Sequence, residues 1–439
     1  MFAQRKFLLV IPDGAGDVHR LQNRTPLAEA SVPYWDWLAA EGTCGLMQTL
    51  YEDLPRGSIV AQLGMLGWDP YLYSGHGRAI WELLALKEVQ LDPTDLVFRA
   101  NLVTMAERRL ISYNAGYILT DKARVLVERI NAALGREFQD IELHHNCDFR
   151  NSLIMRGAGA DPALLVCPEP HDHEGTEFEI AKLTAGKDPQ SEAVAARLNG
   201  YLVRVAEVLA GELANMLVPW SASRSSLALP SFRDNTGFEG RAAIVGCMDF
   251  LKGIAKMGGM DFFKVGNGRP GTDYAGKGAK VLELLEAGYS FVVCHINSPD
   301  EAAHMHDREM KIHCLEAIDR HILGPLVEYF RWRQEELGGL LVAPDHYTNL
   351  LLGDVRADAH SLHPVPFVLW NGRDRDQVSR FDEDSVRMGL YGTSPVSHLN
   401  LLPILWNADR SVGLRARHEG RRFDEDSDAV HLSPQSPTG

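Results

Sequence analysis

The sequence predicts an α/β protein, in which a mainly parallel sheet with helices on both faces is interrupted by an inserted α+β domain. Two features of the chain support this prediction. Short apolar segments of strand length alternate with helical segments at the start of the chain and again from about residue 240, a pattern typical of parallel strands buried on both faces. Between these parts, strand-like pieces surround a helical segment near 121–134 and precede a longer one near 189–216.

The first part of the core is expected to hold a strand, a helix and a helix that starts at a turn. The strand is KFLLVI at 6–11, which ends shortly before Asp13. A helix is expected over 32–42, where a glycine would end it. The segment RGSIVAQLGMLGW at 56–68 predicts a tight turn followed by a helix with Ser58 at its N-cap.

From about residue 240, strands and helices alternate regularly. We therefore assign the core to 1–87 and 236–410, and an inserted cap domain to 88–235. The polar tail at 411–439 is expected to be disordered. The strand-like segments of the second part are RAAIVG, DFFKVG, SFVVCHI, LGGLLVAP and PVPFVLW.

Composition excludes several classes of protein. The chain has 439 residues and a net charge of −15, which argues against a large nucleic-acid surface. Its apolar runs are far shorter than the roughly 18 residues of a spanning helix, and the N-terminus lacks the features of a signal peptide. We expect a cytoplasmic protein that binds neither nucleic acid nor membrane. The six cysteines form no CxxC pair, so a disulfide framework is not expected.

Polar residues gather where the predicted strands end or helices begin. Because functional groups of open α/β sheets collect beyond the carboxyl ends of the strands, we expect these side chains to meet at one edge. Carboxylates with imidazoles suit divalent Mn, Zn or Mg, and two such ions clamp a transferring phosphoryl group. A serine at a helix start beside a metal is a candidate nucleophile. The candidate residues are Asp13, Ser58, Asp300, His304, Asp345, His346 and His360.

Each of these residues also has a simpler explanation. An acid after a strand is commonly a cap, an aspartate followed four residues later by a histidine is commonly a solvated helix face, and a lone histidine commonly packs without binding a metal. Taken one at a time, we would favour these explanations. Because every member falls at a strand end or a helix start, we favour a site for two metals.

Over about residues 6–408 the chain contains a series of longer motifs, in this order: LLVIPDGAGD, TPLAEASVPYWDWLAAEGTCGLM, RGSIVAQLGMLGWDPYLYSG, INSPDEAAH, APDHYT and AHSLHPVPF. In these motifs the chain is similar to the alkaline phosphatase superfamily and, within it, to the archaeal-type cofactor-independent phosphoglycerate mutases. The fixed order of the motifs makes the resemblance more specific than any single motif would.

The resemblance implies an alkaline-phosphatase-like core, a phosphorylated serine at Ser58 and two divalent metal ions, with Mn expected and Mg, Zn or Co as alternatives. One metal would lie on Asp300, His304 and His360. The other would lie on Asp13, Ser58, Asp345 and His346. No 2,3-bisphosphoglycerate is implied, and the substrate would be a small phosphorylated metabolite. The family also tends to place a phosphate-facing lysine where Lys252 stands.

The cap departs from the mutase pattern. Ser112, Tyr113 and Asn114 stand where an acid and two arginines are usual, and Gln62 replaces a histidine in the nucleophile segment. Segments such as FRANLVT, YNAGYI and EPHDHEG resemble a sister branch of homoserine kinase-like proteins. Two functions therefore stay open, phosphoglycerate mutase and a kinase-like phosphotransferase or phosphatase for another small metabolite. The complete ligand set disfavours a non-catalytic paralogue.

For the mutase, Arg99 or Arg150 would supply contacts from the cap to the substrate, although exposed arginines commonly serve only solubility. The sequence leaves the oligomeric state open.

Overall fold

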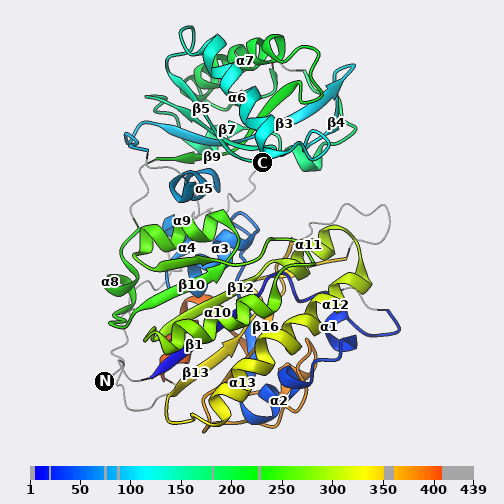
Figure 1. Cartoon of the computed structure of the whole chain (residues 1–439), viewed down its shortest axis with the longest axis vertical. Helices are drawn as coiled ribbons and strands as arrows, with labels where there is room; N and C mark the ends of the chain where they lie inside the picture. Colours follow the sequence, from blue (N-terminus) through cyan, green and yellow to red (C-terminus); the bar gives the residue numbers. More distant parts are fainter. Residues whose placement is uncertain are drawn as a thin grey trace, which may run out of the picture.

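The structure is a computed structural model, and it describes residues 5–18, 21–73, 77–86, 89–179, 182–225, 229–350 and 360–407. The tail predicted at 411–439 lies outside the described residues. Figure 1 shows a larger α/β body below and a smaller one above, with the helix α5 (Ala79–Leu86) between them.

The larger body, or core, is built on an eight-stranded sheet. The first five strands of its order pair in parallel, and β16 then runs antiparallel to both of its neighbours. The prediction of a mainly parallel α/β sheet is therefore confirmed. In spatial order, the strands are β11 (Asp261–Lys264), β10 (Ala242–Gly246), β12 (Phe291–Ile296), β1 (Lys6–Pro12), β13 (Leu337–Val342), β16 (Val365–Trp370), β2 (Thr43–Gln48) and β17 (Tyr391–Ser397).

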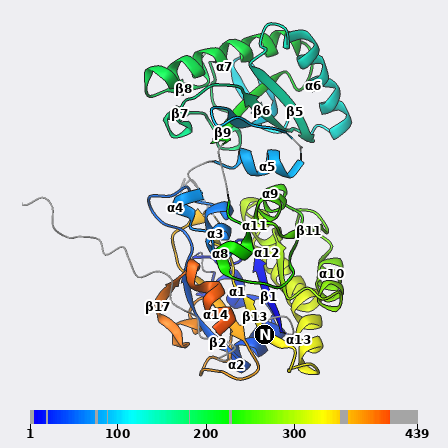
Figure 2. The same cartoon turned by 90° about the vertical axis from the view of Figure 1, so that its left-hand side faces the viewer.

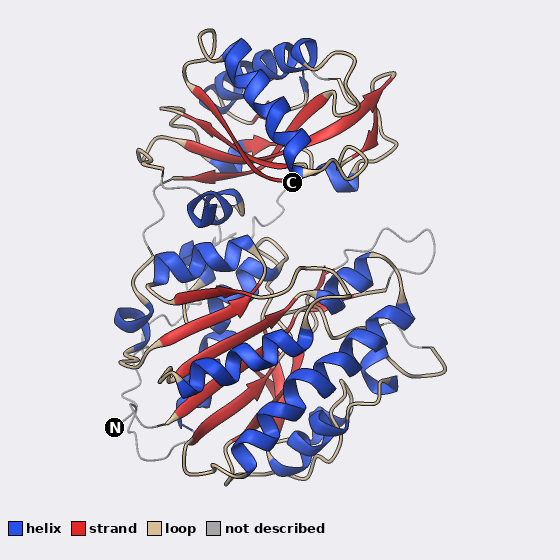
Figure 3. Cartoon of the chain, viewed as in Figure 1, coloured by secondary structure: helices blue, strands red, loops and turns tan. Residues whose placement is uncertain are grey.

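Alternation along the strands sends side chains to two separate apolar layers. On β1, Leu8 and Val10 pack with one layer, whereas Phe7 and Leu9 pack with the other. Both faces are covered by helices, as Figures 2 and 3 show. The first layer holds α2 (Pro33–Glu41), α10 (Tyr274–Glu286), α12 (Arg308–Ile318) and α13 (Gly324–Arg331), and the second holds α3 (Ser58–Met65), α5, α8 (Phe232–Thr236), α9 (Asp249–Gly258) and α14 (Leu401–Asn407).

Shorter elements connect these layers. Helix α11 (Ser298–His304) follows β12, and a π-helical segment, Asp319–Leu323, joins α12 to α13. The remaining short elements of the core are α1 (Pro26–Glu29), α4 (Pro70–Tyr73), the strand pair β14 (Tyr347–Thr348) and β15 (His360–Ser361), and the turns Ser385–Met388 and His398–Asn400. Within the described residues, no helix is long and apolar enough to cross a membrane.

The smaller body, or cap, contains a five-stranded antiparallel sheet with helices on one face. Along β3, Phe98 and Ala100 pack beneath the helices, so Arg99 and Asn101 project from the opposite face, toward the core. The strands of this sheet are β3 (Leu96–Ala106), β4 (Arg109–Ser112), β5 (Ile141–Cys147), β6 (Arg150–Met155) and β9 (Met216–Arg224). The helices are α6 (Thr120–Leu134) and α7 (Pro189–Val208). The cap also contains a short strand pair, β7 (Leu165–Val166) and β8 (Ala185–Gly186), and the turns Pro162–Leu164 and Pro170–Asp172.

Helix α5 is fixed to both bodies. It lies so close to α9 that a Cβ added to Gly253 would fall 2.0 Å from the Trp81 carbonyl oxygen. On the cap side, the Arg78 backbone N–H donates to Ser221 Oγ at 2.9 Å. Helix α8, which falls inside the range expected for the cap, packs instead with the core, where the Phe232 ring stacks on Phe291.

Candidate metal centre

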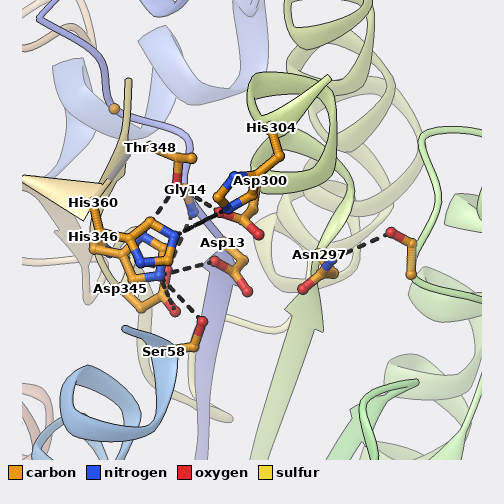
Figure 4. A network of polar contacts seen from close by, with 12 residues as sticks. Asp13, Gly14, Ser58, Asn297, Asp300, His304, Asp345, His346, Thr348 and His360 are labelled. Atoms are coloured by element: carbon orange, nitrogen blue, oxygen red, sulfur yellow. Dashed lines mark hydrogen bonds and ion pairs between the residues drawn. The ribbon is translucent and has the colours of Figure 1, made fainter. Parts of the chain in front are cut away.

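The candidate ligands meet at one edge of the core sheet and come from the ends of β1 and β13, from α3 and α11, and from the short strand β15. Figure 4 shows them around a single point, beyond the ends of β1, β12 and β13 and beside the start of α3. The N-cap of α3 is Gly57, so Ser58 is the first residue of the helix and not its cap. All seven residues selected from the sequence lie in this network: Asp13, Ser58, Asp300, His304, Asp345, His346 and His360.

The first group surrounds His346. Its Nε2 lies 3.1 Å from Ser58 Oγ, 3.5 Å from Asp13 Oδ1 and 3.6 Å from Asp345 Oδ2. Both acids and the imidazole are fully buried. Burial lowers the pKa of His346 to about 4, so its nitrogen is unprotonated at neutral pH and able to bind a metal.

The second group surrounds Asp300. Its Oδ1 lies 3.4 Å from both His304 Nε2 and His360 Nε2, and the two imidazole nitrogens are 3.2 Å apart. Burial alone would raise the pKa of Asp300, but the contacts with both histidines outweigh burial and hold that pKa well below its ordinary value. The rings of His346 and His360 lie 4.0 Å apart, so the two groups adjoin.

The donor set fits divalent cations. Within the described residues, Asp13 Oδ1 is buried without a hydrogen-bond partner. Burial raises the pKa of Asp13 well above its ordinary value, as do the negative charges of Asp345 and Asp300. Three buried acids this close together repel one another, and a cation between them would remove the repulsion. The oxygen and nitrogen donors suit Mn, Mg, Zn or Co.

Gln62 and His295 support the first group and were missed in the sequence. Gln62 Nε2 donates to Asp345 Oδ2 at 2.8 Å and lies 2.9 Å from His295 Nε2. That imidazole nitrogen lies 3.1 Å from Asp13 Oδ2. One signal was available, since Gln62 follows Ser58 by one helical turn and therefore lies on the same face of α3.

Thr348 and Gly14 support the second group. Thr348 Oγ1 donates to Asp300 Oδ1 at 2.6 Å. Gly14 has a φ of +67°, and a Cβ there would fall 2.4 Å from Thr348 Oγ1 and 2.8 Å from the Asp300 Cα. Only glycine therefore combines this left-handed backbone with the close approach of Asp300.

A buried lysine joins the loops that carry these ligands. Lys311 Nζ donates to the carbonyl oxygens of Gly16 and Thr348 at 3.0 and 2.7 Å and pairs with Asp17 Oδ2 at 3.0 Å. Burial lowers its pKa despite the nearby acid. Lys311 thus ties the loop after β1 to the loop after β13, which keeps both metal groups in register.

The cap places two of the selected cations on the side that faces the core. Arg99 is buried, and its guanidinium lies 4.0 Å from the centre of the Trp220 ring. Arg150 stacks on Phe149 at 4.3 Å, and its positive charge reaches the core, where it opposes the rise in the pKa of Glu301 caused by burial and by Asp300. Lys252 differs, because it lies on the exposed side of α9 and is not part of the network in Figure 4.

The segment that replaces the usual arginines forms a turn. Asn114 is buried, and its Oδ1 accepts hydrogen bonds from the Ser112 hydroxyl and the Tyr117 backbone N–H at 2.9 and 3.1 Å. The Tyr113 ring packs edge-on against Phe149. These contacts maintain the shape of the turn and contribute no positive charge.

Comparison with known proteins gives the family. A family model described as 2,3-bisphosphoglycerate-independent phosphoglycerate mutase matches residues 39–215. A protein of that name from Methanosarcina barkeri is 32% identical over 407 residues, covering 90% of this chain and 98% of the relative. Another, from Methanothermobacter thermautotrophicus, is 33% identical over 403 residues and covers 88% and 94%.

Solved structures agree with this fold. A protein from Pyrococcus horikoshii matches with a TM-score of 0.70 at 25% identity and covers 94% of this chain and 100% of that one. The cofactor-independent phosphoglycerate mutase from Thermoplasma acidophilum matches with a TM-score of 0.55 at 24% identity and covers 92% and 99%. The chain therefore belongs to the 2,3-bisphosphoglycerate-independent phosphoglycerate mutase family.

Proposed function

We propose that this protein interconverts 3-phosphoglycerate and 2-phosphoglycerate through a phosphoserine at Ser58, with two divalent metal ions. The observation that carries the proposal is Ser58 at a helix start, 3.1 Å from His346 Nε2 and beside two adjoining ligand groups. Membership of the mutase family over nine-tenths of the chain supports the same activity.

The residues of the core divide the work of the first transfer. Asp13, Asp345 and His346 would hold one ion, and Asp300, His304 and His360 the other. Divalent ions bound there would lower the pKa of the Ser58 hydroxyl and would offset the negative charge of the phosphoryl oxygens. Ser58 Oγ then attacks the phosphorus, and the bond from phosphorus to the C3 oxygen of glycerate breaks.

The second transfer returns the phosphoryl group. The glycerate stays in the site and places its C2 hydroxyl at the phosphoserine. That oxygen attacks the phosphorus, the bond to Ser58 Oγ breaks, and 2-phosphoglycerate leaves. Because Ser58 is the donor, no 2,3-bisphosphoglycerate is needed. Closure of the cap over the site would exclude water and so favour transfer over hydrolysis.

Arginines at the junction of the core and the cap would hold the anionic groups of the substrate. Arg99 and Arg150 face the core from the cap, and Arg78 lies at the start of α5. The charge of Arg78 reaches Asp13, where it opposes the rise in pKa caused by burial and by Asp345. Guanidinium groups bind carboxylate and phosphate oxygens in pairs, which suits a glycerate that carries both. Manganese as the metal and the cytoplasm as the location stay predictions from the sequence.

A coupled assay tests the proposal. Purified protein loaded with Mn is incubated with 3-phosphoglycerate, and the 2-phosphoglycerate formed is converted by enolase to a product that absorbs in the ultraviolet. We expect formation of 2-phosphoglycerate that requires both the metal and Ser58. No product at any Mn, Mg, Zn or Co concentration would contradict the proposal.

A second function is favoured by one observation in the cap. The Ser112–Asn114 turn carries no cation where the mutase pattern usually has two arginines. A phosphotransferase or phosphatase for another small metabolite, such as homoserine or its phosphate, would keep the same metal core. Running the same preparation with homoserine and ATP, and with phosphohomoserine, separates the two functions.

A further inference from the structure

A single carboxylate binds two of the arginines that face the core. Glu82 Oε1 lies 2.9 Å from Arg78 Nε, and Glu82 Oε2 lies 2.9 Å from Arg99 Nε. The side chains of Glu82 and Arg99 are 9% and 10% exposed, so most of this contact is shielded from water. Arg78 is one helical turn before Glu82, whereas Arg99 comes from the cap strand β3.

Aromatic rings support both guanidinium groups from another side. The Arg99 guanidinium lies 4.0 Å from the Trp220 ring centre, and the Arg78 guanidinium lies 4.8 Å from that of Phe250. Trp220 is itself fixed, because its Nε1 donates to Asn101 Oδ1 at 3.0 Å. An acid and a ring thus fix the orientation of each guanidinium.

This arrangement leaves the terminal nitrogens of both arginines for another ligand. Among the described residues, the side-chain hydrogen bonds and ion pairs of Arg78 and Arg99 join the Nε atom of each arginine to Glu82. Two guanidinium groups share one carboxylate and Arg150 adds a third positive charge, of which the charge of Glu169 offsets a part at Arg99. The charges of Arg99, Arg78 and Arg150 outweigh burial and lower the pKa of Glu82, which is therefore ionised at neutral pH.

We infer that Glu82 is a positioning residue, which holds Arg78 and Arg99 so that their Nη groups face a phosphate or carboxylate of the substrate. The inference rests on the proposed function, because it assigns Glu82 to the anion site of the same reaction. Without the carboxylate, Arg99 would be buried and unpaired beside a second cation, and we expect it to turn away from the site. The substrate would then lose a two-point contact and the alignment that this contact provides.

The test compares Glu82→Gln with Asp95→Asn, a matched control. Asp95, which lies in the cap, is also a buried acid that pairs with an arginine, Arg156, at 2.7 Å, but it does not contact Arg78 or Arg99. For Glu82→Gln, we expect kcat/KM to fall roughly ten- to hundredfold with an increase in KM and unchanged metal content. The control should lose stability in thermal unfolding and keep its KM.

A double mutant separates positioning from simple stabilisation. In an Arg99→Lys background, the Glu82→Gln change should cost less, because one of the two arginines through which Glu82 acts is already gone and only the effect through Arg78 remains. Equal and additive losses in the two backgrounds would overturn the inference, as would a KM for Glu82→Gln that matches wild type.

Inorganic phosphate gives a readout that does not depend on the reaction. Calorimetry on the Mn-loaded protein should show weaker phosphate binding by Glu82→Gln than by wild type and the Asp95→Asn control. If Glu82→Gln binds phosphate as tightly as wild type, or more tightly, then Glu82 acts on the site only through its charge. That result would overturn the inference. If the wild-type protein binds phosphate but does not convert 3-phosphoglycerate, the proposed function is overturned. The phosphate-binding comparison alone then decides whether Glu82 positions the two arginines.

Discussion

The core and the cap hold charge in opposite ways. At the edge of the core sheet, buried acids lie together with imidazoles, and Asp13 Oδ1 lacks a hydrogen-bond partner within the described structure. On the cap face opposite, Arg99 and Arg150 stack on aromatic rings, and Arg99 also pairs with Glu82. The core would therefore be stabilised by cations taken from solution, whereas the cap supplies its own positive charge.

This difference divides the reaction between the two bodies. The core groups would carry out the chemistry, since the proposed nucleophile and the proposed metal ligands share one edge of the sheet. The cap groups are arranged to recognise an anion, which would explain how a chain with a net charge of −15 accepts a negatively charged substrate. Changes in the core should therefore alter turnover or metal content, and changes in the cap should alter substrate binding.

The largest effect is expected at the nucleophile. Ser58→Ala removes the only oxygen that we assign to the covalent intermediate, so mutase turnover should fall by at least roughly 10³-fold. The coupled enolase assay measures this fall, and elemental analysis should show at most a partial loss of the ion expected on Asp13, Asp345 and His346, because those three ligands remain. Retention of substantial turnover by this variant would mean that the core does not transfer the phosphoryl group through Ser58.

The next effect concerns the metal that would lie on Asp300. Asp300→Asn weakens the ligand group that includes His304 and His360, so we expect about one fewer ion per chain and a lower unfolding temperature in Mn. The matched control is Asp307→Asn, because Asp307 caps α12 by accepting from the Met310 backbone N–H, and asparagine caps equally well. Equal loss of metal in both variants would argue against a specific ligand role for Asp300.

A smaller effect is expected in the cap. Arg150→Ala should raise KM for 3-phosphoglycerate roughly tenfold and leave the metal content unchanged, because the residue is proposed to contact the substrate and not the metal. Arg197→Ala is the control, since Arg197 also lies 4.3 Å from a ring centre, that of Phe138, but its side chain pairs with Asp140 between α7 and the loop before β5. If both variants bind substrate like wild type, the cap face does not recognise the anion through Arg150.

The smallest effect concerns an acid of the core outside the metal groups. Burial raises the pKa of Glu383 to about 7, although Thr25 and the Asp17 backbone N–H donate to it. The folded protein therefore binds this proton more tightly than the unfolded chain, and the stability gained is lost as pH rises from about 4.5 through about 7. Relative to Glu383→Gln, wild type should lose on the order of 1–3 kcal/mol over that range. Parallel unfolding curves for the two proteins across pH would contradict this.

The composition of the core site could be predicted because its signals are local. Asp13, Asp345 and Asp300 follow apolar segments that are recognisable as strands, and the fold brings such positions to one edge. His295 was missed because a histidine inside a buried strand looks like a packing residue until the Asp13 carboxylate is found 3.1 Å away. Lys311 was missed for a related reason, since its partners come from loops that are distant in sequence.

The cap site depends on contacts that the sequence does not display. Arg99 meets Trp220 because β3 and β9 pair antiparallel, and the register, which shifts at this point, sets the two residues opposite each other. Only the spacing of Arg78 and Glu82, four residues apart on a helix, gave a local signal. The expected role of Lys252 in binding phosphate stays a prediction, because it relied on the family pattern and not on a contact.

The central claim is that Ser58 carries the phosphoryl group between two positions of one substrate. Mn-loaded protein is mixed with 3-phosphoglycerate, quenched with acid within milliseconds to seconds, digested and analysed by mass spectrometry. We predict a phosphate on the peptide that contains Ser58, appearing before 2-phosphoglycerate accumulates and absent from the Ser58→Ala variant. Formation of 2-phosphoglycerate with no phosphate on Ser58 at any quench time would contradict the claim.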